Sequence, residues 1–337
     1  MNRPIIGITI GDPAGIGPEI TIKALMRSEI YDEVRPLVFG DRSVLEQALA
    51  MLDGSRKWNV VEHPGDGKYE AGTLDFIDVG AWSGPVSFGT LQPEAGRAAY
   101  AYLTRAIEDA LEGRIEAICT APINKESLRA AGIPYVDHTA ILKHQTGVQD
   151  IMGLFIVRAL RIFFLTRHIA FRDIPKYITH GRILHAVRLC DRYLRELDIA
   201  DPHVAVAALN PHGGEHGLFG TEEEQIIAPA IQAAKKAGLR VSGPVPADAV
   251  FHQASEGKYD GVLSLYHDQG HVAAKTLEFR RAVALTMGLP FLRTSVDHGT
   301  AFDIAGEGIA DETGMVEAVK VAGKYGKSVR EHQKRET

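Results

Sequence analysis

Short apolar runs alternate with helix-compatible stretches along most of this chain, and this alternation constrains its fold more than any other feature. The first instance is the run Ile5–Ile10, a glycine-rich turn, and a helical stretch from Pro18 to Met26, since proline is favoured in the first turn of a helix. The pattern recurs at residues 36–39 with 44–52, 117–120 with 125–131, 204–208 with 221–237, and 261–265 with 271–277. Such alternation predicts an α/β fold with a mainly parallel sheet and helices on both faces.

Three other stretches have a recognisable period. Residues 93–111 and 182–197 carry apolar side chains at helical spacing, which predicts two amphipathic helices. Residues 151–166 indicate two strands that meet around Ala159-Leu160, which predicts a hairpin outside the parallel layer. A chain of 337 residues with 45% hydrophobic composition is long enough for two domains, each with its own core.

Charge and apolar runs exclude several classes of partner. The chain has 37 basic and 43 acidic side chains, a net charge of −6, without long blocks of one sign, which argues against nucleic acid or an anionic membrane as partner. The most apolar stretch, residues 151–165, is interrupted by Arg158 and Arg161 and is too short to span a bilayer. The N-terminal apolar run ends at once in a polar turn, unlike a signal peptide, so we expect a cytoplasmic protein.

Histidine gives the strongest chemical signal. The two cysteines, Cys119 and Cys190, lie in apolar surroundings where buried thiols are expected, so any metal ligands must be nitrogen or oxygen atoms. Ligands of open α/β sheets bind at the carboxyl ends of the strands, and three neutral imidazoles with open positions form a catalytic metal site. A single histidine is more often an ordinary surface or core residue. The set of histidines in predicted strand-end loops nevertheless favours His168, His212 and His267 as ligands of one ion.

The glycine-rich turn at residues 11–19 lies between a strand and a helix, where backbone N–H groups could hold an anion. It does not match the dinucleotide-binding fingerprint, because Ile20 stands where a glycine is required, Pro18 removes a donor and Glu19 would repel a pyrophosphate. A tight packing turn and a ligand-facing loop are equally consistent with the sequence. In the second case Asp12 is a candidate polar group at the edge of the active cleft.

Two basic side chains near the same loops indicate the charge of the ligand. Lys275 follows His267 by one or two helical turns, and Arg293 directly precedes Thr294 and Ser295. Either cation alone is more often a solvated side chain. Together they could hold a phosphate or a carboxylate, the arginine through its planar fork. The expected ligand is therefore an anionic small molecule.

Several long motifs, in the same order, resemble the 4-hydroxythreonine-4-phosphate dehydrogenase family. They are Gly-Asp-Pro-Ala-Gly-Ile-Gly-Pro-Glu at 11–19, Ala-Pro-Ile-Asn-Lys at 121–125, Asn-Pro-His-Gly-Gly-Glu at 210–215, Gly-Thr-Glu-Glu at 220–223, Tyr-His-Asp-Gln-Gly at 266–270 and Arg-Thr-Ser-Val-Asp-His-Gly-Thr-Ala at 293–301. The resemblance runs from residue 5 to about residue 325. It implies NAD-dependent and divalent-metal-dependent oxidation of a phosphorylated 3-hydroxy acid, followed by loss of CO₂. It also implies a homodimer whose active site lies in a cleft at the subunit interface.

The resemblance also implies the metal ligands. They carry over as His168, His212 and His267, the last supplied by the partner subunit, and the ion could be Zn, Co, Ni, Mn or Mg. Asp248 and Asp268 are candidate catalytic residues. Because sequence gives no distances, the general base stays open between these two carboxylates and a water molecule.

Substrate contacts carry over as His138, Thr139, Lys275 and Arg293, and His138 is also a catalytic candidate. The family has an asparagine in the strand before Gly-Leu-Pro, at the position of Ala284 in this chain. A site without that amide cannot form a hydrogen bond with the substrate group that the amide would bind, and so cannot use that bond to discriminate between substrates. The departure therefore points to a different substrate.

A more distant likeness concerns the cofactor. Residues 297–310 are similar to the loop with which isopropylmalate dehydrogenases bind the adenosine half of NAD without a Rossmann fold. The likeness implies cofactor contacts from His298, Gly299, Thr300 and Asp303, since glycine permits close backbone approach and a carboxylate accepts hydrogen bonds. A helix-capping turn is the alternative, and the choice between NAD and NADP stays open.

The resemblances together imply two α/β/α domains of the isocitrate/isopropylmalate dehydrogenase type, with no Rossmann domain. We expect the first domain to comprise residues 1–130 with residues 300–337. The second, residues 131–299, is expected to carry the dimer interface. The active cleft is expected between the two.

Within the family two substrate classes lead. Oxidation of D-threonate or D-erythronate 4-phosphate would yield dihydroxyacetone phosphate in carbohydrate catabolism, and 4-phosphohydroxy-L-threonine would be the substrate in pyridoxine biosynthesis. The motifs at 121–126, 217–220 and 267–271 resemble the catabolic branch more closely. A third relative oxidises a carboxylated cyclic dihydrodiol, which the retention of Lys275 and Arg293 disfavours. The alternative of another class is a non-catalytic metal-binding or anion-binding protein with the same fold.

Overall fold

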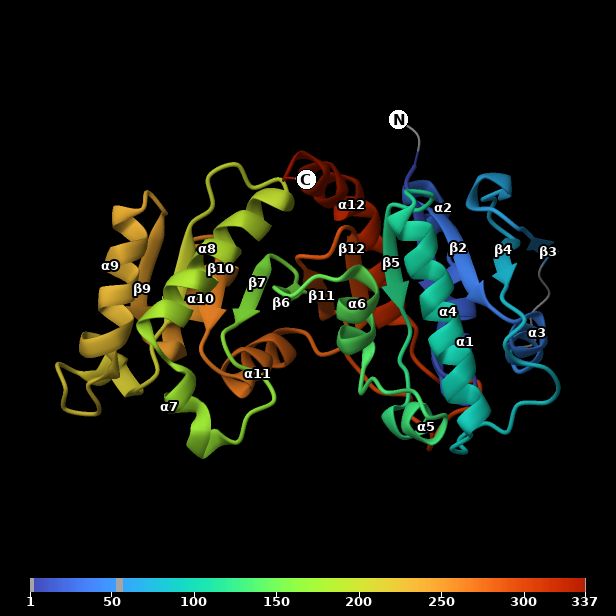
Figure 1. Ribbon diagram of the computed structural model, residues 1–337, viewed down its shortest axis with the longest axis horizontal. Coiled ribbons are helices and arrows are strands. Elements are labelled where there is room, and N and C mark those ends of the chain that lie inside the picture. The colour runs from blue at the N-terminus through green and yellow to red at the C-terminus, as the bar shows by residue number, and fades with distance from the viewer. Residues whose placement is uncertain (1–2, 53–56, 337) are drawn as a thin grey trace. The chain divides into compact units, whose positions relative to one another are not determined.

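The computed structural model describes residues 3–52 and 57–336, and the chain divides into two compact units (Figure 1). The first unit comprises Met1–Ile151 with Val283–Thr337, and the second comprises Met152–Ala282. Each unit contains a β-sheet packed against helices, which confirms the expected α/β class. The expected domain boundaries, at residues 131 and 299, both fall inside the first unit. Within the described ranges, no helix combines the length and the apolar composition needed to cross a membrane.

The sheet of the first unit is built around β1. Its strands follow the order β3-β4-β2-β1-β5-β12-β11. Their bounds are β1 Ile5–Thr9, β2 Arg35–Gly40, β3 Lys57–Val60, β4 Thr73–Asp78, β5 Ala117–Thr120, β11 Val283–Met287 and β12 Leu292–Val296. Neighbouring strands are parallel except for β11 and β12. This order differs from the 3-2-1-4-5-6 order of a Rossmann domain, and the unit takes strands from both ends of the chain.

Two long helices pack on the central strands of this sheet. The helices of the first unit are α1 Gly17–Leu25, α2 Ser28–Glu33, α3 Arg42–Ala50, α4 Pro93–Leu111, α5 Lys125–Ala130, α6 His138–Thr146 and α12 Thr313–Glu336. α4 matches the helix expected at 93–111 and packs on β1, β2 and β5, whereas α12 packs on β5 and β12 (Figure 1). Thr294 Oγ1 donates to a main-chain carbonyl of α12 at 2.9 Å. Because side chains alternate along a strand, the preceding residue of β12, Arg293, points away from α12.

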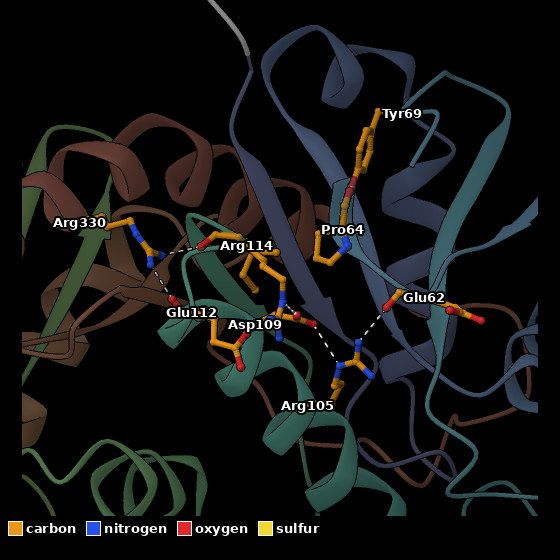
Figure 2. Close-up of polar contacts among 10 residues, drawn as sticks. Glu62, Pro64, Tyr69, Arg105, Asp109, Glu112, Arg114 and Arg330 are labelled. Carbon is orange, nitrogen blue, oxygen red and sulfur yellow. Dashed lines mark hydrogen bonds and ion pairs between the residues drawn. The ribbon is translucent and has the colours of Figure 1, made fainter. Parts of the chain in front are cut away.

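A buried carboxylate fixes the turn that leads from α4 into β5. Asp109 is fully buried and accepts hydrogen bonds from Arg105 Nε at 3.2 Å and from Arg114 Nε (Figure 2). Arg330 of α12 donates to two main-chain carbonyl oxygens of the same turn, at 2.7 and 2.8 Å. Removal of one partner from a buried ion pair leaves an uncompensated charge, which is strongly destabilising. These arginines therefore position the start of β5, the strand that ends at Thr120.

The sheet of the second unit has the strand order β6-β7-β10-β8-β9. Its elements are β6 Met152–Val157, β7 Leu160–Phe164, β8 Val204–Ala207, β9 Val241–Val245, β10 Gly261–Ser264, α7 Ile174–Tyr177, α8 His180–Glu196, α9 Ala228–Lys236, α10 Ala247–Ser255 and α11 His267–Leu277. β6 and β7 form an antiparallel hairpin in which Val157 pairs with Leu160, as the sequence predicts. The expectation that this hairpin lies outside the parallel layer is wrong, because β7 pairs in parallel with β10. β7, β10, β8 and β9 are parallel, so their carboxyl ends lie at one edge of the sheet.

Candidate active site

Arg293 lies in β12 with its guanidinium buried; the residue is 7% exposed. It stands directly opposite Thr286 of β11, and the neighbouring strand β5 ends at Thr120. Arg293 Nε and Nη2 donate to Thr120 Oγ1 at 3.1 and 2.6 Å, and Nη1 donates to Thr286 Oγ1 at 3.3 Å. Hydroxyls from two strands thus hold the plane of the guanidinium. A buried, oriented arginine fork is suited to binding a phosphate or a carboxylate.

His138 is brought close to this arginine. It is the first residue of α6, a helix capped by Asp137, whose side chain accepts a hydrogen bond from the Ala140 N–H at 2.9 Å. Burial, and then the positive charge of Arg293, hold the pKa of His138 well below its ordinary 6.5, against the opposing effect of a hydrogen bond to the main chain of Ala121. The ring is therefore neutral at physiological pH. Its buried Nε2 has no hydrogen-bond partner in the described part of the chain, so it can accept a hydrogen bond from a ligand hydroxyl.

Ala284 lies on the same face of the sheet as Arg293. Ala284 and Thr286 are two positions apart in β11, so their side chains share one face of the sheet. Thr286 is directly opposite Arg293, which places Arg293 on that face too. A methyl side chain at this position offers no hydrogen bond to a ligand held by the arginine. Thr139, a further expected substrate contact, is half-buried in the first turn of α6 and directly follows His138.

The three candidate metal ligands follow three neighbouring parallel strands of the second unit. His168 follows β7, His212 follows β8, and His267 is the first residue of α11 after β10. All three therefore stand at the carboxyl edge of the sheet, where ligands of α/β folds bind. The ring centroids of His168 and His267 are 5.9 Å apart, and both rings line a pocket of about 380 Å³.

His212 lines a different pocket, of about 200 Å³, together with His216 and Glu223. Its backbone is left-handed, with φ 53°, in the turn after β8. Among residues 3–52 and 57–336, no three His, Cys, Asp or Glu side chains of this one chain are grouped so that they could hold a metal ion. The described chain therefore brings His168 and His267 together and leaves His212 apart.

Neighbouring side chains restrict the ring of His267. Its Nδ1 lies 2.6 Å from Asp268 Oδ1, which leaves Nε2 available to a ligand. The ring stacks on His271, one helical turn later, with centroids 3.8 Å apart and 10° between the planes. His271 in turn lies 4.4 Å from the ring of Phe155 and 4.5 Å from that of Phe164. His271 enters the sequence analysis only as part of the motif 267–271, although its i, i+4 spacing from His267 predicts that the two rings share a helix face.

The remaining candidates of the second unit lie on α10 and α11. Asp248 and Asp268 both line a pocket of about 750 Å³ whose other walls include Phe251 and Val272. Lys275 follows two turns after the start of α11, and its Nζ lies 5.2 Å from the centre of the Phe279 ring. The structure therefore places Asp268 both beside a candidate metal ligand and at this larger pocket, whereas Asp248 reaches only the pocket.

Residues 297–312 connect β12 to α12 without helix or strand. His298, Gly299 and Asp303 are exposed, and a Cβ added at Gly299 would meet open space, so the backbone there is open to a ligand. Thr300 differs from the other three expected cofactor contacts. It is buried, and its carbonyl accepts a hydrogen bond from the Ile16 N–H at 3.0 Å.

The glycine-rich turn at residues 11–19 uses backbone donors inside the protein. The Asp12 N–H donates to the Pro122 carbonyl at 3.0 Å, and the Ile16 N–H is used as described above. A Cβ on Gly11, whose φ is +69°, would lie 2.2 Å from the Pro122 oxygen. Asp12 is fully buried, and burial raises the pKa of its carboxyl. Of the two interpretations left open by the sequence, the structure shows the tight packing turn.

Known proteins resemble this chain over nearly its whole length. A family model described as pyridoxal phosphate biosynthetic protein PdxA matches residues 32–322. A relative from Symbiobacterium thermophilum named "Putative D-threonate 4-phosphate dehydrogenase" is 51% identical over 330 residues, 98% of either chain. A relative of the same name from Clostridium botulinum (strain Langeland) is 49% identical and covers 96% of this chain and 97% of its own. The solved 4-hydroxythreonine-4-phosphate dehydrogenase of Klebsiella pneumoniae is 40% identical, with a TM-score of 0.90 over 96% of this chain and 98% of that one.

Proposed function

Because the chain belongs to the family of the pyridoxal phosphate biosynthetic protein PdxA, we propose that it is an NAD-dependent and metal-dependent dehydrogenase of a 4-phosphorylated 3-hydroxy acid. The leading substrates are D-threonate 4-phosphate and D-erythronate 4-phosphate, and the products are dihydroxyacetone phosphate, CO₂ and NADH. The observation that carries the proposal is Arg293, a buried guanidinium oriented by Thr120 and Thr286. Burial of a charged side chain costs free energy, and such costly groups cluster at functional sites, where a bound anion can compensate the charge.

The chain's own groups would recognise and orient the substrate. Arg293 binds an anionic end, and Lys275 supplies a second positive charge for the other anionic group. The neutral His138 offers Nε2 as an acceptor for a substrate hydroxyl, and Thr139 adds a hydroxyl beside it. Arginine and lysine together favour a ligand with two anionic groups, which a phosphorylated hydroxy acid has.

His168, His212 and His267 are the proposed ligands of a divalent ion. The donor set fits, because imidazole nitrogens are common ligands of divalent ions, and a carboxylate at His267 Nδ1 is the partner that metal-binding histidines commonly have. Bound there, the ion would lower the pKa of the substrate hydroxyl and stabilise negative charge that develops on that oxygen. Asp248, Asp268 and a water molecule remain the candidates to take up the hydroxyl proton.

The chain is proposed to act as a homodimer with a shared active site. The resemblance assigns His267 to the partner subunit, whereas in the described part of one chain it is His212 that lies apart from His168 and His267. The pair found within one chain therefore differs from the pair that the resemblance implies, and the proposed dimer is the assembly in which all three imidazoles would meet. Ultracentrifugation at micromolar concentration should therefore give twice the chain's mass of 36.7 kDa.

NAD is proposed to bind at residues 297–310, where His298, Gly299 and Asp303 are exposed. The open space at Gly299 allows the dinucleotide to approach the backbone, and the Asp303 carboxylate can accept hydrogen bonds from a ribose. Bound there, the cofactor would accept hydride from C3 and so produce a β-keto acid, which loses CO₂. Thr300 contributes to this loop by packing, since its side chain is buried.

Two observations favour the catabolic substrates over 4-phosphohydroxy-L-threonine. The relatives at 49–51% identity carry the D-threonate 4-phosphate name. Ala284 also lies on the Arg293 face, where the family's amide would offer one more hydrogen bond. A carboxylated cyclic dihydrodiol has no phosphate, so it offers one anionic group fewer to Arg293 and Lys275.

The deciding assay is NADH formation with each of the three phosphorylated acids and added divalent metal. We expect the two sugar-acid phosphates to have the highest kcat/KM and to yield dihydroxyacetone phosphate and CO₂ in equal amounts. The Ala284→Asn variant should shift the ratio toward 4-phosphohydroxy-L-threonine. If that compound is the best wild-type substrate, the enzyme belongs to pyridoxine biosynthesis instead. If no acid supports NADH formation with any metal, the protein is a non-catalytic member of the fold.

A further inference from the structure

The segment 297–312 is long, partly exposed and without regular secondary structure, and charged side chains contact it near one end. Ile309, for example, is 63% exposed. Two residues of α1 reach this segment close to its C-terminal end. They are Glu19, which is buried, and Lys23, whose side chain is 18% exposed. Both belong to the helix that follows the glycine-rich turn.

The contacts of this pair account for every donor of the ammonium group. Lys23 Nζ donates to the carbonyls of Gly308 and Ala310 at 2.8 and 2.7 Å, and to Glu19 Oε1 at 2.7 Å. Glu19 Oε1 also accepts the Ala310 N–H at 2.7 Å. An ammonium has three donors. Two of the three bind main-chain oxygens of the loop. An i, i+4 pair that merely stabilised α1 would need only the contact between its two side chains.

The other end of the segment is held by the same stretch of chain. The Ile16 N–H donates to the Thr300 carbonyl at 3.0 Å, and a Cβ on Gly15 would lie 2.9 Å from the Cβ of Thr300. Thr300 and Ala310 are thus both fixed by residues 15–23, and Asp303 lies between the two fixed points. Charge-assisted hydrogen bonds of this kind are stronger than neutral ones. They reduce the conformational freedom that the loop would lose on binding a ligand.

We propose that Glu19 and Lys23 are positioning residues for the dinucleotide: they hold residues 300–310 in the conformation that binds NAD, without touching it. This inference rests on the proposed assignment of that loop to the cofactor. It also gives a role to Glu19, whose charge is unsuited to a phosphate-binding turn. The carboxylate faces the loop amide of Ala310 and not an anion.

The test compares NAD⁺ binding and loop protection in four proteins: the wild type, Lys23→Met, Glu19→Gln and Arg27→Met. The last is the matched control, because Arg27 also pairs with a residue of the segment 297–312, but this residue is Glu312, which lies beyond residues 300–310, and the ion pair, at 2.5 Å, is exposed. Dissociation constants for NAD⁺ and, separately, for D-erythronate 4-phosphate are measured by calorimetry. Amide hydrogen exchange is followed over residues 300–310.

Lys23→Met should raise the NAD⁺ dissociation constant about tenfold, because apparent affinity falls with the fraction of loop in the competent conformation. It should also speed exchange over 300–310 and leave the affinity for D-erythronate 4-phosphate unchanged. Glu19→Gln keeps an acceptor for the Ala310 N–H and should show a smaller effect in the same direction. Arg27→Met should bind NAD⁺ as the wild type does.

Equal NAD⁺ affinity and equal exchange in wild type and both α1 variants would overturn the inference and leave the proposed function intact. Equal loss of both ligands in Lys23→Met would also overturn it, since that is the result of a general structural role. If Lys23→Met does not fold, the nearly isosteric Glu19→Gln carries the same comparison. Failure of the wild type to bind NAD⁺ would overturn the cofactor assignment itself, and this inference with it.

Discussion

The two groups of candidate site residues differ in burial and in how their side chains are oriented. In the first unit, Arg293 lies inside the sheet with its guanidinium held by hydroxyls of two neighbouring strands. In the second unit, His168 and His212 are exposed in the loops that follow strands, and the side chain of His267 is 39% exposed at a helix start. The arginine is oriented by folding alone. The histidines stand at one sheet edge but need a further partner or an ion to complete a site.

This difference separates two sources of substrate affinity. A preorganised buried charge loses its hydration and takes up its orientation when the chain folds. It can therefore bind an anion without further rearrangement. Exposed imidazoles gain their role only when the ion is bound, because metal affinity depends on having all ligands in place. The account therefore expects charge recognition to survive treatments that abolish metal binding, and the following variants probe each half.

The largest effect is expected for the metal ligands. His267→Ala should lower metal-dependent turnover by more than about a hundredfold, since loss of a ligand exceeds the 10–100-fold cost of losing an outer-shell partner. His216→Ala is the matched control, because this histidine neighbours His212 but its side chain is 95% exposed. Turnover and metal content are measured for both. Retention of wild-type metal content by His267→Ala would remove this residue from the ligand set.

Arg293→Ala should be the next most severe change. Loss of a buried charge-assisted contact should cost about 2–5 kcal/mol in kcat/KM for a phosphorylated acid. Arg293→Lys should not restore the activity, because lysine lacks the planar fork that Thr120 and Thr286 hold. Arg172→Ala, at a side chain that is 90% exposed, should behave as the wild type. Full rescue by lysine would show that the charge suffices and that the fork is not used.

His138 gives the first unit a distinct pH dependence of stability. Its folded pKa lies well below the ordinary 6.5, so below that pH the unfolded chain takes up a proton that the folded chain does not. The free energy of unfolding should therefore fall as the pH falls below about 6.5, by up to ~1.4 kcal/mol per pH unit from this group. Urea unfolding of wild type and His138→Gln between pH 5 and 8 measures the difference. Parallel curves for the two proteins would contradict a neutral buried ring.

The smallest effects are expected for the two threonines, and their ranking follows the geometry. Thr120 Oγ1 accepts two hydrogen bonds from Arg293, the shorter at 2.6 Å, and Thr286 Oγ1 accepts one at 3.3 Å. Thr120→Val should cost about 1–3 kcal/mol in kcat/KM, as for a hydrogen bond to a charged group, and Thr286→Val less. The corresponding serine variants keep the hydroxyl and should retain most activity. A reversed order would mean that the orientation of Arg293 is set elsewhere.

Much of the fold follows from local sequence pattern, and the exceptions have physical reasons. The helix at Pro93–Leu111 and the turn between β6 and β7 agree with the predictions because each has a strong period of its own. β4 was not predicted, since Asp75 interrupts its apolar run. That carboxylate is buried and accepts the N–H groups of Lys68 and Tyr69, both at 2.8 Å. A long-range partner of this kind leaves no local signal.

The sequence yields the candidate site as a list of residues and not as an arrangement. Sequence order placed histidines after strands, and the parallel pairing of β7, β10 and β8 gathers them at one edge. Thr120 and Thr286 were missed because their contact with Arg293 depends on strand register between distant segments. Glu19 was judged from its charge alone, although its partner Ala310 is 291 positions away. Such pairings appear only once the chain is folded.

The most direct test of the account is binding of D-erythronate 4-phosphate to protein stripped of metal with EDTA. Calorimetry on wild type, Arg293→Ala and His267→Ala separates the two halves of the site. The account predicts that metal-free wild type and His267→Ala still bind the ligand with similar affinity, and that Arg293→Ala loses binding with or without metal. If removal of the metal abolishes binding while Arg293 is intact, recognition of the anion is not built into the sheet of the first unit, and the central claim is wrong.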